Sequence, residues 1–146
     1  MVSQPRVTNY NTQNLFLGQN FYADATYTNS TGSEVTISNG RLLGRVQATN
    51  KVLPQVTAAT DGSELPIGVA AGDYVVAKGS TVTITYCYGG PVAEGLVILN
   101  GSDTMATAVA TPSAGAGGTI HDLIVRNTQI DLVPGIQLSA YDNAIS

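Results

Sequence analysis

The eight residues TVTITYCY at 81–88 constrain the fold more than any other stretch of this chain. The even-numbered residues are aliphatic or aromatic, whereas the odd-numbered ones are three threonines and Cys87. Because successive side chains of a strand point to opposite faces, the alternation puts the large apolar side chains on one face. A helix would scatter the same residues around its axis. The stretch therefore predicts a β-strand, and the sequence Gly89-Gly90-Pro91 predicts its end.

Further strand-like runs separated by turn residues occupy much of the remaining chain. The runs EVTIS at 34–38 and RLLGRVQA at 41–48 flank Asn39-Gly40, a pair typical of the tight turn of a β-hairpin. The stretch LPIGVAAGDYVVA at 65–77 reads as a pair of buried strands. These runs indicate a mainly β domain.

Only one segment, TIHDLIVRNTQ at 119–129, has a plausible helical pattern. Thr119 can cap a helix that starts there, and Asp122 three residues later nearly completes a capping box. A strand is the alternative, because Ile124 and Val125 are β-branched. The chain is accordingly expected to be mainly β with at most one short helix.

The first 20 residues differ in character from the rest. They are polar and rich in Asn and Gln, and they bury too little apolar surface to form a core. We expect an extended N-terminal arm over 1–20 and a single β-rich domain over 21–146, a size that suits one domain. The apolar residues Leu15, Phe16 and Leu17 are expected to anchor the inner end of the arm. A frayed terminus without a role is the alternative.

Charge argues against several classes of partner. The net charge is -4, and the six Lys and Arg residues are spread along the chain. Nucleic-acid binding needs clustered phosphate contacts, so we expect none. No apolar run approaches the roughly 20 residues of a transmembrane helix, and no basic membrane-surface patch is visible. Charged residues make up only 11% of the chain, which suits close packing against other protein subunits.

Residue types that carry catalysis or bind metals are scarce. His121 is the only histidine and Cys87 the only cysteine, so neither a His/Cys metal site nor a nucleophile–base pair is expected. The nearby carboxylates Asp61 and Glu64 do not complete a calcium loop. The glycine-rich stretch at 113–118 lacks the lysine of a phosphate-binding loop. We therefore expect a protein without enzymatic activity, metal or cofactor.

A longer pattern resembles the lambda-type head decoration proteins of tailed bacteriophages. The resemblance extends from Arg41 to Ala140 and rests on the order of features along the chain. These are an LLG turn, the Asp61-Gly62 turn, IGVAA at 67–71, the threonine-rich strand, VAEGLVI, the candidate helix and a C-terminal GIQLSA strand.

The resemblance implies a β-clip-like small domain that assembles as a homotrimer on the outer surface of an expanded capsid. Such proteins cement neighbouring major capsid subunits, so the implied partner is the major capsid protein. The implied location is the virion, after synthesis in the host cytoplasm, to which the lack of a signal-peptide pattern also points. Residues 2–17 would be the docking arm, in which Pro5 limits strand pairing locally. The implied capsid-binding residues are Val2, Gln4, Pro5, Val7, Tyr10, Leu15, Phe16 and Leu17.

Two other functions fit the same composition. One is another β-rich virion component, such as a head fibre base or a tail module. The other is an adhesive surface domain, which normally carries a signal segment and more evenly spaced strands.

Overall fold

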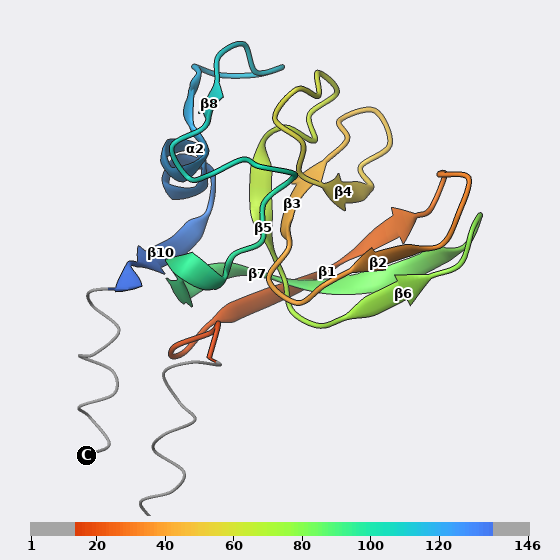
Figure 1. Ribbon diagram of the computed structural model, residues 1–146, viewed down its shortest axis with the longest axis horizontal. Helices are drawn as coiled ribbons and strands as arrows, with labels where there is room; N and C mark the ends of the chain where they lie inside the picture. Colours follow the sequence, from red (N-terminus) through yellow and green to blue (C-terminus); the bar gives the residue numbers. More distant parts are fainter. Residues whose placement is uncertain (1–13, 136–146) are drawn as a thin grey trace, which may run out of the picture.

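Strand β7 (Thr81–Ala93) is the longest element, and it pairs with three other strands (Figure 1). The computed structural model describes residues 14–135. Ile84 and Tyr86 are buried while Thr81 and Thr83 are exposed, so the predicted alternation is confirmed. The prediction that the strand ends at Gly89-Gly90-Pro91 is wrong. Beyond Gly89 a second, parallel partner takes over from the first, and pairing with it continues as far as Ala93.

The main sheet is mostly antiparallel and has β1 at one edge. Its order is β1-β7-β5-β3-β4, and β10 pairs in parallel with the second half of β7. Figure 1 shows β1 and β7 as a long ribbon below β3, β4 and β5. Besides β7, the strands of this sheet are β1 (Phe21–Thr28), β3 (Leu42–Arg45), β4 (Val52–Pro54), β5 (Pro66–Ala70) and β10 (Gln129–Val133).

A second sheet consists of β2 (Val35–Ile37) and β6 (Tyr74–Val76). The turn predicted at Asn39-Gly40 is present, but the predicted hairpin across it is wrong, since β2 pairs with β6 and β3 pairs with β4 and β5. Gly40 has a φ of 97° and is buried against the Leu96 carbonyl. The chain that leaves this turn pairs with residues near Ile98 instead of returning along β2.

Two clusters of buried side chains form the core. One joins β1 and β7 to β2, β3, β4 and β6, and it includes Tyr27, Ile37 and Ile84. The other lies between the main sheet and helix α2 (Ile120–Asn127), and it includes Leu123 and Ile124. Strand β7 contributes to both clusters, which makes the two parts one packed unit.

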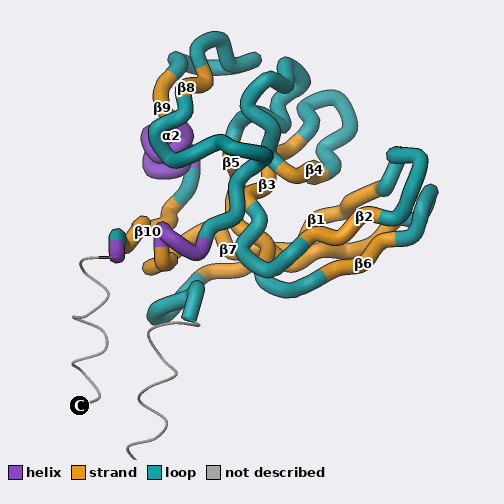
Figure 2. Tube along the Cα trace, in the orientation of Figure 1, coloured by secondary structure: helices purple, strands orange, loops and turns teal. Residues whose placement is uncertain are grey.

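Helix α2 confirms the helix predicted within 119–129, although it ends at Asn127 and Gln129 already begins β10. The Thr119 hydroxyl accepts the Asp122 N–H at 3.1 Å, and the Asp122 carboxylate accepts the Thr119 N–H at 3.2 Å. This reciprocal pair is the capping box that the sequence suggested. Within residues 14–135, α2 is the one α-helix, so the expectation of a mainly β chain with a single short helix is confirmed (Figure 2).

The remaining elements are short. A 3-10 turn η2 (Glu94–Leu96) follows β7, and strands β8 (Ala108–Val109) and β9 (Gly118–Thr119) pair around the glycine-rich loop. Among the helices of the described residues, none has the length and apolar character needed to cross a bilayer. The C-terminal strand predicted from 135 to about 141 lies, apart from Gly135, outside the described residues.

Candidate docking surface

The outer edge of β1 has a defined register. Asp24 lies opposite Thr85 of β7. The Thr85 N–H donates to the Tyr74 hydroxyl at 2.9 Å, and the Thr85 carbonyl accepts the Ala71 N–H at 2.9 Å. Both main-chain groups of Thr85 therefore point away from β1. Because antiparallel pairs alternate between hydrogen-bonded and non-hydrogen-bonded types, Asp24 and Thr85 form a non-hydrogen-bonded pair.

The same alternation gives the direction of the main-chain groups along the rest of β1. Because alternate residues of a strand direct their N–H and carbonyl groups to the same side, those of Tyr22 and Thr26 point outward from the sheet like those of Asp24. No strand of residues 14–135 pairs with this edge. At the far end of β1, the Lys51 ammonium donates to the Thr28 hydroxyl at 3.0 Å. A charged side chain at this end disfavours pairing with another strand there. Residues 22–26 contain neither lysine nor proline and form an edge able to accept an added strand.

The exposed face beside this edge is polar and ordered. The Thr85 hydroxyl donates to the Asp24 carboxylate at 2.7 Å, and the Thr28 and Thr81 hydroxyls lie 2.8 Å apart. The opposite face of β1 carries Tyr27, which is buried in the core. Core packing and cross-strand hydrogen bonds thus fix β1 in place, which presents its outer edge as a rigid template.

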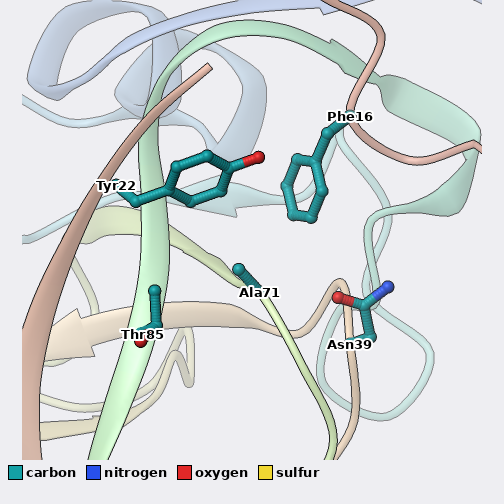
Figure 3. A pocket seen from close by; sticks show the side chains of 5 residues that line it. All are labelled: Phe16, Tyr22, Asn39, Ala71 and Thr85. Carbon is teal, nitrogen blue, oxygen red and sulfur yellow. The ribbon is translucent and has the colours of Figure 1, made fainter. Parts of the chain in front are cut away.

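A shallow hollow of about 430 Å³ adjoins the open edge. Figure 3 shows Phe16 and Tyr22 pointing toward one another across it, with Asn39, Ala71 and Thr85 completing the lining. The two rings meet edge to face, with centroids 5.7 Å apart and an interplanar angle of 81°. Tyr22 is 49% exposed, and partial burial raises the pKa of its phenol. A protonated phenol beside an apolar ring suits contact with another protein surface.

The predicted attachment of the apolar residues Leu15, Phe16 and Leu17 to the domain is confirmed. The Leu15 side chain is buried in the core, and its carbonyl accepts the Ala93 N–H at 2.8 Å. The Leu17 N–H donates to the Pro91 carbonyl at 3.0 Å. Residues 15–17 therefore belong to the β domain, whose predicted start was residue 21. Of the predicted capsid-binding residues, Phe16 lines the hollow and Leu15 faces the core; Val2, Gln4, Pro5, Val7 and Tyr10 lie outside the described residues.

Asn20 was missed by the sequence analysis. Its side-chain amide donates to the carbonyls of Pro91 at 2.9 Å and Gly89 at 3.2 Å. It also approaches the Cys87 sulfur at 3.6 Å. These contacts hold the chain just before β1 begins. No local pattern could have identified this residue, because its partners are 67 to 71 residues away along the chain.

Cys87 is a packed residue, although it alternates with the large apolar side chains of β7 and shares their opposite face with threonines. It is fully buried, and its thiol donates to the Gly89 carbonyl at 3.1 Å. Burial raises the pKa of this thiol, and the contacts with Gly89 and Asn20 only partly offset that effect. A buried, protonated thiol is a poor nucleophile.

Glu64 has a structural position that its sequence context did not reveal. The side chain is fully buried, and its carboxylate accepts the Gly62 N–H at 2.9 Å and the Ser113 N–H. It thereby joins the turn that contains Asp61 to the glycine-rich loop. Burial raises the pKa of Glu64, but the hydrogen bonds from Ser113 and Gly62 outweigh it, so the net shift is downward. Across residues 14–135, no three His, Cys, Asp or Glu side chains gather as metal ligands would.

Protonation of Glu64 is expected to destabilise the fold. A carboxyl group with a lowered pKa contributes stability above its unfolded pKa of about 4.5, and that contribution is lost as the pH falls through the folded value. Asp61 shifts in the same direction, because its carboxylate accepts hydrogen bonds from Ser63. Thermal unfolding between pH 7 and pH 3 should show a melting temperature that falls below about pH 4.5.

The variant Glu64→Gln provides the matched control for that measurement. Its amide nitrogen faces an N–H donor, so the variant should lose about 1–3 kcal/mol of stability at pH 7. Its melting temperature should also depend less steeply on pH than that of the wild type. Equal slopes for the two proteins would assign the acid sensitivity to other groups.

Neither family models nor curated protein sequences yield a match to this chain.

Proposed function

We propose that this protein is a structural virion component that binds the outer surface of an expanded phage capsid as a trimer and cements neighbouring major capsid subunits. The open edge of β1 carries the proposal. A rigid edge whose residues 22–26 have no strand partner within 14–135 can accept an extended segment of a neighbouring capsid subunit through main-chain hydrogen bonds. Main-chain pairing needs an extended partner of suitable register and no reactive side chain.

The N-terminal segment supplies a second attachment in this proposal. Leu15 and Leu17 fix its inner end to β7, so residues 2–13 start from a defined point on the domain. The hollow is lined both by Phe16, beside this point, and by Tyr22 of the open edge. Three copies in a trimer multiply weak contacts through a high effective concentration.

Binding to the expanded lattice alone would stabilise that lattice by mass action. We therefore expect the purified protein to co-sediment with expanded shells of its cognate major capsid protein and to remain in the supernatant with unexpanded shells. Mass measurement of the free and the bound protein should give a multiple of three in the bound state. Equal binding to both shell forms, or binding to neither, would refute the proposal.

A further inference from the structure

Exposed apolar side chains lie around Arg41, at the start of β3. Leu96, Ile98 and Val56 are 38%, 42% and 36% exposed. Arg41 connects them, since its guanidinium donates to the Ile98 carbonyl at 3.4 Å and to the Gln55 carbonyl at 3.1 Å. These four residues, Arg41, Val56, Leu96 and Ile98, are called the Arg41 patch below.

The patch also contains a main-chain edge. The Ile98 N–H donates to the Gly40 carbonyl at 2.8 Å, and the Ile98 carbonyl accepts the Leu42 N–H at 3.0 Å. Ile98 thus directs both its main-chain groups toward β3. In an extended segment the groups of the next residue point the opposite way, so the N–H and carbonyl of Leu99 face outward. A short edge therefore borders the apolar side chains.

Arg41 retains a positive charge with incomplete compensation. Both of its hydrogen bonds within residues 14–135 go to neutral carbonyl oxygens. Burial lowers the pKa of this guanidinium, and the charge of Asp103 offsets that effect only in part. A half-buried cation of this kind favours a further carboxylate nearby.

The C-terminal residues 136–146, with the sequence IQLSAYDNAIS, match these requirements in chemistry. Ile136, Leu138 and Ala140 alternate with polar Gln137 and Ser139, as in a half-buried strand. Asp142 is the only charged side chain of the segment. It therefore offers apolar groups for the patch and one carboxylate for Arg41.

The place where this segment leaves the domain is also suitable. Val133 of β10 pairs with Ala93, the residue immediately before η2. Figure 1 shows the end of β10 beside the short turn that follows β7. From Ala93 to Leu99 the chain covers about 6 Å in the 3-10 turn and about 10 Å in the extended residues 97–99. Residues 136–142 span up to about 23 Å, which is enough to cover the patch.

We propose that residues 136–142 of the chain dock on the Arg41 patch of the same molecule, with the alternating segment along the edge at Leu99 and the Asp142 carboxylate near Arg41. The docking covers an apolar surface that would otherwise be a second site, besides β1, for contacts with other proteins. It is independent of the proposed capsid function, because it concerns contacts within one chain.

Hydrogen exchange of the full-length protein, followed by mass spectrometry of C-terminal peptides, tests this docking. In the wild type, amides of 137–142 should exchange at least tenfold more slowly than in an unstructured peptide of the same sequence. Ile98→Asp and Asp142→Asn should each remove most of that protection. Val125→Asp is the control, since Val125 is 55% exposed on α2 and should leave the protection unchanged.

Three outcomes would overturn the proposal. Unprotected wild-type amides would show that the segment does not dock. Protection that survives Ile98→Asp would place the docking site elsewhere. Protection that increases with protein concentration would show docking on a second copy instead of the same molecule.

Discussion

The variant Gly44→Ala is expected to lose about 3 kcal/mol or more of folding stability. Gly44 is buried in β3, where an added Cβ would lie 2.0 Å from the Ser63 carbonyl oxygen and 2.6 Å from the carbonyl carbon. These are main-chain atoms, so no side-chain rotation relieves the clash. The melting temperature should fall by at least about 9 °C, measured by circular dichroism.

The turn at Ser63 has little freedom to move away from Gly44. The Asp61 carboxylate accepts both the N–H and the hydroxyl of Ser63, and the next residue, Glu64, is fully buried. Gly32→Ala is the matched control, because a Cβ there meets nothing within 4 Å and Gly32 lacks a positive φ. This control should change stability by less than about 0.5 kcal/mol. A Gly44→Ala protein as stable as Gly32→Ala would contradict the packing described for β3.

Removal of residues 2–13 is expected to weaken binding to expanded shells by a factor of about 100 or more. In the proposed function these residues form one of two attachments on each of three copies, so their loss is multiplied across the trimer. The domain itself should remain folded, because Leu15 keeps its core position and its bond to Ala93. Co-sedimentation at a series of protein concentrations gives the change in affinity.

A glycine–serine segment of equal length in place of residues 2–13 shows whether shell binding depends on the sequence of the arm or only on its length. It should bind as weakly as the deletion, since it lacks the apolar side chains of Val2, Val7 and Tyr10. Wild-type affinity in either variant, with an unchanged melting temperature, would remove the arm from the docking surface.

The sequence predicted the elements whose signals are local. The alternation at 81–88 identified β7, since strand periodicity appears within eight residues. Thr119 and Asp122 identified the start of α2, since a capping box spans four residues. The attachment of Leu15 followed from the apolar run that it forms with Phe16 and Leu17.

Features set by contacts between distant residues escaped prediction. Asn39-Gly40 forms a turn, but the strands on its two sides lie in different sheets. The residue after the turn, Arg41, pairs with the distant Ile98 instead of with β2. The extension of β7 to Ala93 depends on β10, which is about 40 residues further along the chain. The buried carboxylate of Glu64 depends on Ser113 in a distant loop. Sheet order, and with it the open edge of β1, is a property of the whole fold.

Shell binding by Thr26→Pro tests the role of that edge most directly. Thr26 directs its N–H outward, so proline removes a donor from the open edge and leaves the bonds between β1 and β7 in place. Thr26→Val keeps the N–H and serves as the control. The account predicts that Thr26→Pro, with a native circular dichroism spectrum, binds expanded shells at least tenfold more weakly than Thr26→Val. Equal binding by the two folded variants would contradict it.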